Sequence, residues 1–216
     1  MARSQAEKAQ TRERILTEAA AQIRDTGLES VSIASLMHSV DLTHGGFYNH
    51  FESRADLLVQ ALERALEEGA ARSRQFRDPS RPPGRPVGFE SFVKHYLSRS
   101  HRDARAQGCA LAALASDVAR ADAPVRAVME QRFEAFVGAV AQAMQQDDHG
   151  HGPGETRAKA SSKASAKTSA EDAALSDRAT TAACTLIGAL LMSRVMTDPK
   201  QSDALLRTVR EQISGI

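Results

Sequence analysis

Residues 42–51, LTHGGFYNHF, gather side chains that could bind an anionic partner, in a chain with only 4% aromatic residues. The stretch holds a phenol at Tyr48, a carboxamide at Asn49 and imidazoles at His44 and His50. Such groups hydrogen-bond well to phosphate oxygens, and contacts of this kind fix the position of a protein on a nucleic acid without reading its sequence. The stretch is therefore the first candidate for a binding surface.

Two adjacent glycines, Gly45 and Gly46, lie in the middle of this stretch. A glycine inside a helix costs about 1 kcal/mol relative to alanine, so a pair of them needs an explanation. In the first turn of a helix, the missing Cβ atoms would let backbone amides approach phosphates or base edges closely. The alternative is that both glycines belong to a loop, and spacing alone does not separate the two interpretations.

The elements on either side of the stretch are predicted to be short helices. A first helix over residues 4–25 ends at Gly27, and Ser32 is the expected N-cap of a second one. Thr43 is the expected N-cap of the third, in which Phe47 and Phe51 are four residues apart and share one face. Those two rings are predicted to anchor the third helix and to leave its polar side chains outside.

This arrangement of two short helices around a tight turn predicts a helix-turn-helix, whose second helix enters the DNA major groove. A longer helix is expected over residues 53–77, beginning at Ser53 and Asp56. The prolines of residues 78–88 cannot continue it, because they lack the amide donor and clash with the preceding turn.

Residues 30–58, SVSIASLMHSVDLTHGGFYNHFESRADLL, resemble the DNA-binding signature of TetR-family transcriptional regulators. The family has a helix-turn-helix, a Tyr-x-His-Phe element and a further helix that begins Ser-Lys or Ser-Arg. The resemblance implies phosphate contacts from one group of residues and base-facing positions for another. The first group is Ser32, Thr43, Tyr48, His50 and Arg54; the second is His44, Gly45, Gly46 and Asn49.

Two positions depart from the family pattern. The turn has Val40 and Asp41 where the family usually has a small residue and a glycine, although aspartate tolerates the left-handed conformation better than most residues. Met37 stands where the family commonly has alanine, which predicts a bulkier contact between the second helix and its neighbours.

The rest of the chain is also predicted to be helical, so the expected fold class is all-α. Residues 1–60 form the DNA-binding domain, the helix over 53–77 links the domains, and residues 61–216 form the second domain. Residues 147–174 are rich in Gly, Ser, Ala and Lys and are predicted to be a mobile loop, because they cannot bury enough apolar surface. Two helices follow the loop, the second starting at Asp198 and Pro199.

The resemblance implies that this second domain encloses a small-molecule inducer and that its last two helices form a homodimer. A dimer would present two recognition helices to a palindromic operator in double-stranded DNA. Cys109 is expected at the start of a helix, where a thiol can become reactive toward electrophiles or oxidants. It joins the tentative ligand-binding residues, which are Phe92, Tyr96, Cys109, Met129, Phe133 and Phe136.

Composition narrows the other function classes. The net charge is +1, and residues 1–60 hold fewer Lys and Arg than Asp and Glu, so DNA binding must rest on local arrangement. The start of the chain lacks the apolar core of a signal peptide, so a cytoplasmic protein without membrane spans is expected. The two cysteines, Cys109 and Cys184, predict neither a disulfide framework nor a metal site.

Two other functions remain open at the level of the sequence. A helical enzyme is disfavoured, because no Glu-x-x-His, His-x-x-x-His, P-loop or Gly-x-Ser-x-Gly element is present, and no cofactor is indicated. A helical interaction module that has lost DNA binding is the second alternative, and the acidic balance of the first domain favours it slightly. The interpretation adopted is a ligand-responsive regulator, most simply a repressor.

Overall fold

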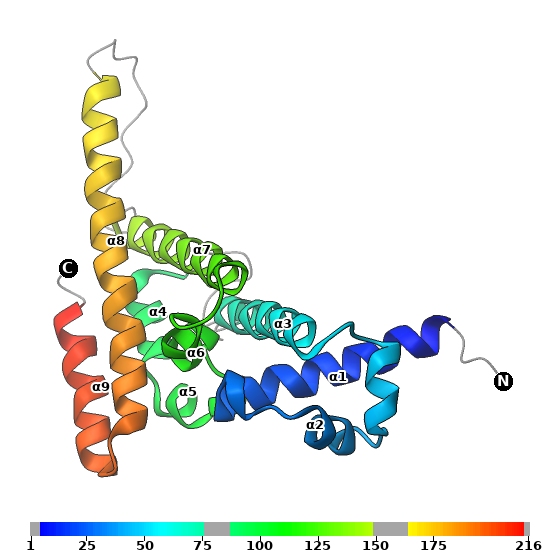
Figure 1. The fold of residues 1–216 in the computed structure, drawn as a ribbon. Helices are drawn as coiled ribbons and strands as arrows, with labels where there is room; N and C mark the ends of the chain where they lie inside the picture. The colour runs from blue at the N-terminus through cyan, green and yellow to red at the C-terminus, as the bar shows by residue number, and fades with distance from the viewer. Residues whose placement is uncertain (1–4, 76–86, 149–163, 214–216) are drawn as a thin grey trace. The chain divides into compact units, whose positions relative to one another are not determined.

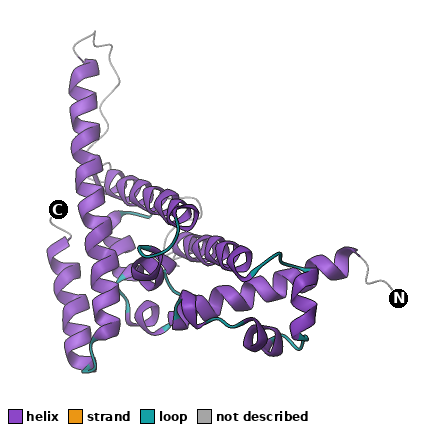
Figure 2. Ribbon diagram, viewed as in Figure 1, coloured by secondary structure: helices purple, strands orange, loops and turns teal. Residues whose placement is uncertain are grey.

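The computed structural model describes residues 5–75, 87–148 and 164–213. In these residues helices are joined by loops and no strand occurs (Figure 2), as the all-α prediction required. The helices are, in chain order, α1 (Gln5–Thr26), η1 (Leu28–Ser30), α2 (Ile33–Ser39), η2 (His44–Asn49), α3 (Arg54–Gln75), α4 (Phe89–Tyr96), α5 (Arg99–Asp103), η3 (Arg105–Gln107), α6 (Ala110–Val118), α7 (Ala123–Asp148), α8 (Ala164–Val195) and α9 (Pro199–Ile213) (Figure 1). No helix in the described ranges is long and apolar enough to span a membrane.

The chain forms two compact units, and the first is discontinuous in sequence. It combines residues 1–74 with residues 103–132, whereas the second combines 75–102 with 133–216. The expected boundary near residue 60 therefore differs from the observed one, since α3, η3, α6 and the start of α7 belong with the helix-turn-helix. Local periodicity could not reveal this, because the contacts that join these segments are long-range.

The core of the first unit is built from one face of each helix. In α1 the buried apolar residues recur at three- and four-residue spacing, as in an amphipathic helix. The helix α3 buries a similar stripe, and α6 is buried along most of its length. The largest buried side chains of these three helices are Ile15, Leu16, Ile23, Leu57, Leu62, Leu66, Leu111 and Leu114.

Polar contacts fix α1 to the returning segment of the first unit. Arg24 is buried, with a 2% exposed side chain, and pairs with Glu68 of α3 at 2.8 Å. Its guanidinium also donates to the carbonyls of Ala106 at 2.7 Å and Ala65 at 3.1 Å. The carboxylate of Asp117 in α6 accepts from the Leu28 amide at 3.0 Å, directly after the turn that ends α1.

Gly27 forms that turn, as the sequence predicted. Its φ of 93° lies in the region that favours glycine, and its amide donates to the Ile23 carbonyl at 2.9 Å. A Cβ at this position would lie 2.8 Å from Asp117 Oδ2. Glycine is therefore needed both for the conformation of the turn and for the approach of α6.

The second unit packs α8 against α9 and α4. Small residues of α8, Ala179, Ala182 and Ala183, are fully buried beside Leu186 and Leu190. On α9, Asp198 accepts from the Lys200 amide at 2.8 Å, which confirms the predicted helix start. Ser202 of α9 donates to the Ser193 carbonyl of α8 at 2.6 Å.

The predicted loop over residues 147–174 is partly wrong. Asp147 and Asp148 continue α7, and α8 begins at Ala164, so its last eleven predicted loop residues, 164–174, are helical. Alanine, lysine and glutamate have high helix propensity, and no glycine or proline interrupts this segment. The middle of the predicted loop, residues 149–163, lies outside the described residues, as do residues 76–86 of the predicted linker.

Candidate nucleic-acid interface

The turn between α2 and η2 is tight and is held by backbone hydrogen bonds. Ser32 caps α2 by accepting from the Ser35 amide at 3.1 Å, as expected. The Leu42 amide returns to the Met37 carbonyl at 2.8 Å, and Asp41 adopts a φ of 59°. Aspartate thus takes the left-handed position that the sequence analysis assigned to it.

The element that follows the turn is a six-residue 3-10 helix, η2, where the sequence predicted an ordinary helix. Thr43 occupies its N-cap position with an extended backbone, but its side chain makes no capping hydrogen bond. The Thr43 carbonyl instead accepts from the Gly46 amide at 2.9 Å. Adjacent glycines lower the stability of an α-helix, and short runs of the tighter 3-10 form are common in such connections.

Two stacked rings hold η2 in place. Phe47 is fully buried and Phe51 is nearly so, with their ring centroids 5.4 Å apart. Met37 is fully buried beside them, and its Cε lies 3.7 Å from the point where a Cβ on Gly46 would be. The bulky Met37 therefore packs directly against the bare backbone of Gly46, which explains how the α2 contact accommodates this side chain.

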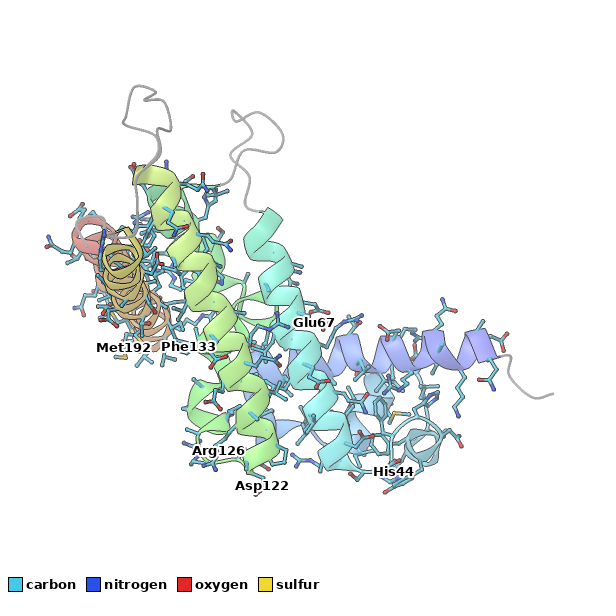
Figure 3. All side chains as sticks on the ribbon, turned by 90° about the horizontal axis from the view of Figure 1, so that it is seen from above. His44, Glu67, Asp122, Arg126, Phe133 and Met192 are labelled. Atoms are coloured by element: carbon cyan, nitrogen blue, oxygen red, sulfur yellow. The ribbon has the colours of Figure 1, made fainter. Side chains whose placement is uncertain are left out.

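The opposite side of η2 faces solvent. Tyr48 is 61% exposed although it follows the fully buried Phe47, and its ring meets the Phe47 ring edge-on at 5.2 Å. His44, at the surface of this unit (Figure 3), lies edge-on to Tyr48 with a centroid separation of 6.3 Å. Thr43, Gly45 and Asn49 are exposed as well, and a Cβ on Gly45 would meet no atom within 4 Å.

Comparison with known proteins agrees with this geometry. A family model described as "Bacterial regulatory proteins, tetR family" matches residues 15–61, which span α1, α2, η2 and the start of α3. The chain belongs to the tetR family. Its first unit therefore carries a TetR-family helix-turn-helix domain, and the loop interpretation of the two glycines is no longer needed. Among curated protein sequences, none matches this TetR-family protein significantly.

Solved structures share the fold of this TetR-family protein over nearly its whole length. E. coli NemR in its reduced form has 16% sequence identity and a TM-score of 0.69, with 96% of each chain covered. A TetR-family regulator from Cytophaga hutchinsonii has 15% identity and a TM-score of 0.73, with 99% of this chain and 98% of that one covered. One from Agrobacterium tumefaciens has 18% identity and a TM-score of 0.69, with 95% and 98% covered. At these identities the likeness concerns the fold.

Arg54 differs from the expected phosphate contact. Its guanidinium donates to the carbonyls of Val31 at 3.1 Å and of Leu28 and Glu29 at 3.2 Å. It also lies 3.4 Å from the Glu29 carboxylate. In this TetR-family protein Arg54 holds the loop between α1 and α2 against α3, a role that sequence spacing could not indicate because Arg54 is more than twenty residues from its partners.

His50 and Ser32 lie at the two edges of the exposed strip. His50 ends η2, its amide donating to the Phe47 carbonyl at 2.9 Å, and its side chain is half-buried. Ser32 is exposed, and its hydroxyl oxygen is the acceptor of the α2 cap. The structure thus places the expected base-facing residues on one face of η2 and divides the expected phosphate contacts between that face and its rim.

The tentative ligand-binding residues of this TetR-family protein separate into three groups. Phe92, Tyr96 and Phe136 pack together in the second unit, with centroid separations of 5.4–6.0 Å. Phe133 lies instead on a groove between α7 and α8. Cys109 and Met129 belong to the first unit, where Cys109 is half-buried at the N-cap of α6.

His101 lies beside this aromatic cluster. It is buried, its ring meets Tyr96 edge-on at 4.9 Å, and its Nδ1 donates to the Tyr96 carbonyl at 2.7 Å. Burial lowers the pKa of His101, the hydrogen bond to Tyr96 opposes that shift, and the positive charge of Arg194 adds to it. The imidazole is therefore an uncharged polar group at the edge of the aromatic cluster.

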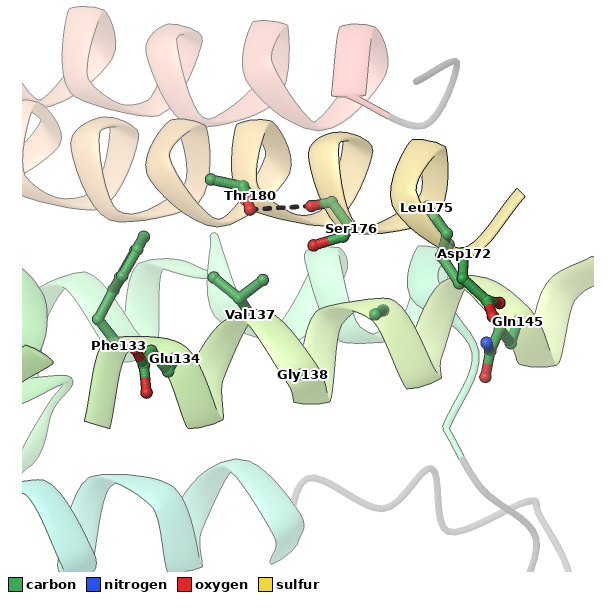
Figure 4. A pocket seen from close by; sticks show the side chains of 10 residues that line it. Phe133, Glu134, Val137, Gly138, Gln145, Asp172, Leu175, Ser176 and Thr180 are labelled. Atoms are coloured by element: carbon green, nitrogen blue, oxygen red, sulfur yellow. Dashed lines mark hydrogen bonds between the residues drawn. The ribbon is translucent and has the colours of Figure 1, made fainter. Parts of the chain in front are cut away.

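The groove between α7 and α8 was not anticipated as a unit. It has a volume of about 540 Å³ and is open to solvent (Figure 4). Its floor is apolar, and two carboxylates lie among its lining residues. Those residues are Phe133, Glu134, Val137, Gly138, Ala141, Gln145, Asp172, Leu175, Ser176 and Thr180. The α8 side was hidden because residues up to 174 were predicted to be a loop.

Proposed function

We propose that the chain is a ligand-responsive transcription regulator that binds a palindromic operator through η2. The observation that carries this proposal is the division of η2 into a buried side and an exposed side. Phe47 is fully buried whereas the adjacent Tyr48 is 61% exposed. A rigid anchor therefore presents a strip of hydrogen-bonding side chains, which is what a helix needs in order to dock in the major groove.

The contacts follow from the chemistry of the exposed groups. Thr43, Tyr48 and His50 bind phosphate oxygens and set the register on the duplex. His44 and Asn49 approach base edges, and the carboxamide of Asn49 has the donor and acceptor pair that suits adenine. Gly45 and Gly46 bring the backbone close to the groove. The interaction-module alternative predicts no saturable binding to any DNA.

Selection of bound fragments from genomic DNA, followed by a mobility shift on the recovered sites, tests the proposal. A regulator should enrich palindromic sites and shift them saturably. If no selected DNA gives a saturable shift, the chain is not an operator-binding protein and the interaction-module alternative is favoured.

Conservative changes on the exposed strip separate phosphate contacts from base contacts. Tyr48→Phe removes one hydroxyl, so it should weaken binding by about 0.5–1.5 kcal/mol per protomer on matched and mismatched sites alike. His44→Ala should instead relax preference at one position per half-site. Binding to a panel of single-base operator variants measures both effects, and the reverse pattern would show that the two faces are exchanged.

Gly45→Ala tests whether bare backbone faces the DNA. Open space surrounds a Cβ at this position in the free protein, so the free energy of unfolding should stay the same or rise by up to about 1 kcal/mol. Operator affinity should nevertheless fall about tenfold or more, because the methyl group would occupy the space closest to the groove. Thermal unfolding and a binding titration measure the two quantities.

Gly138→Ala on α7 is the matched control for this variant. A Cβ on Gly138 also meets no atom within 4 Å, but the residue lies in the second unit. Operator affinity should be unchanged there. Equal affinity for the Gly45→Ala protein and the unchanged protein would mean that Gly45 does not approach DNA.

Dimer formation through α8 and α9 is the second part of the proposal. Leu191, Met192 and Val195 of α8 are 39%, 48% and 62% exposed, and Met192 is seen at the surface of that helix in Figure 3. Large exposed apolar side chains clustered within one helical turn favour association. A two-fold dimer would supply the second recognition helix that a palindromic operator requires.

Release from the operator is proposed to follow a shift between two dimer conformations. One conformation spaces the recognition helices for successive major grooves, and an inducer stabilises another. The aromatic cluster of Phe92, Tyr96 and Phe136, with the uncharged His101, supports an inducer that has an apolar body. Repression relieved by that inducer is the expected outcome.

Thiol modification at Cys109 is proposed as a second route to release. Gly69 of α3 allows a close approach here, since a Cβ on it would lie 3.9 Å from the Cys109 Cα and 3.7 Å from the Gly108 carbonyl oxygen. An adduct on Cys109 would therefore disturb the packing between α3 and α6 inside the unit that carries the helix-turn-helix. E. coli NemR, which shares this fold, was solved in a reduced form.

A further inference from the structure

The region around η2 carries little positive charge for a DNA-binding surface. Residues 5–60 hold five basic side chains against eight acidic ones. Four of the five are arginines, Arg12, Arg14, Arg24 and Arg54, which we call the internal arginines. Each of them is bound to another part of the first unit.

Arg54 and Arg24 are bound most completely. Arg54 donates to three backbone carbonyls of the loop between α1 and α2. Arg24 is buried against Glu68 and two further carbonyls. Neither guanidinium can reach a phosphate without giving up these hydrogen bonds.

Arg12 and Arg14 hold the elements next to η2. Arg14 donates to the carbonyl of Val40 at 3.0 Å, at the end of α2. Arg12 lies over the Phe51 ring with its Cζ 5.1 Å from the centroid, and it donates to the Gln60 side chain. These contacts position α2 and the aromatic anchor of η2 from behind.

The exposed strip itself consists of uncharged donors. Thr43, Tyr48 and Asn49 carry a hydroxyl, a phenol and a carboxamide, and the backbone at Gly45 is open. Lys8, on the exposed side of α1, is the basic residue of this stretch that has no contact with another described residue. Positive charge is therefore spent inside the unit, and neutral hydrogen-bond donors remain outside.

We propose that the internal arginines are positioning residues, so the operator is bound mainly through uncharged donors and few counterions are released on binding. This inference rests on the proposed function. It predicts that operator affinity depends weakly on salt, whereas proteins that neutralise many phosphates lose affinity steeply. The observed logarithmic slope is about −0.9 for each phosphate neutralised on duplex DNA.

A salt titration of the full-length chain on its selected operator tests the proposal. The measurement is fluorescence anisotropy at pH 8, where imidazole side chains are neutral, between 50 and 200 mM KCl. One lysine from each protomer gives an expected slope of about −2, which is a loss of about tenfold over this range. A slope shallower than about −4 supports the proposal, and a slope steeper than about −4, equivalent to a loss above about 250-fold, overturns it.

Variants of single basic residues separate positioning from phosphate contact. Lys8→Gln should make the slope shallower by about 2, because each dimer loses two cations at the interface. Arg54→Gln and Arg14→Gln should lower the affinity but leave the slope unchanged within about 0.5. A shallower slope by more than about 1 in either arginine variant would identify a phosphate contact and overturn the proposal.

Two outcomes are kept distinct by this design. If Arg54→Gln does not fold, Arg14→Gln decides the question, because it loses one printed hydrogen bond to a single carbonyl. Absence of saturable binding by the unchanged protein would defeat the proposed function and this inference with it. Saturable binding with a steep slope would defeat this inference alone.

Discussion

Replacing Phe47 by alanine should lower the free energy of unfolding of the first unit by about 3–5 kcal/mol, because it empties a fully buried aromatic site. The loss includes the stacking contact with Phe51, whose ring centroid lies 5.4 Å away. Since these rings are what holds η2 between the turn and α3, saturable operator binding should be lost at temperatures where the rest of the chain is still folded.

Chemical denaturation followed by circular dichroism measures this effect, and Tyr48→Ala is its control. Tyr48 is adjacent to Phe47 and is 61% exposed, so its removal should change the free energy of unfolding by about 0.5 kcal/mol or less. Operator binding should still weaken in the control, because the phenol is lost from the exposed strip. Equal destabilisation by both changes would contradict the assignment of a buried and an exposed side to η2.

Replacing Arg24 by methionine should cost about 3 kcal/mol or more of unfolding free energy. The side chain is 2% exposed, and its removal leaves Glu68 without a partner at 2.8 Å and two buried carbonyls without a donor. Breaking one side of a buried pair typically costs about 3–5 kcal/mol. Glu68 keeps its contact with Arg64 at 3.0 Å, so the lower end of that range is expected.

Arg120→Gln is the matched control for the Arg24 variant. Arg120 pairs with Asp117 at 3.0 Å in the same unit, but its side chain is 73% exposed. Pairs on the surface contribute about 0–1 kcal/mol, so the control should unfold almost like the unchanged protein. A cost below about 1 kcal/mol for Arg24→Met would show that the contacts of Arg24 do not hold α1 to its neighbours.

The local features of the helix-turn-helix could be predicted from sequence because each rests on residues close together in the chain. Ser32 caps α2 through an amide three residues away, and Gly27 and Asp41 take the left-handed backbone that their types favour. Phe47 and Phe51 share a face because they are four residues apart. Propensity and spacing contain all of this information.

The features that were missed depend on contacts between distant segments. Nothing near Arg54 indicates that its guanidinium reaches back to the loop after α1, and nothing near Arg24 indicates that it is buried against Glu68 and Ala106. The groove residue Asp172 was hidden by a composition argument that underestimated the helix propensity of residues 164–174. Polar side chains thus gave the least predictable part of the candidate site, since their partners are set by the tertiary fold.

The discontinuous first unit has a consequence for synthesis on the ribosome. When residue 75 has been added, α1, α2, η2 and α3 exist, but the carbonyl of Ala106 and the carboxylate of Asp117 that complete their contacts do not. Residues 76–132 require about 3–11 s at about 5–20 residues per second. During that interval the apolar face that α6 later covers is open to chaperones and proteases, so the DNA-binding part is the first to be made but cannot be the first to finish folding.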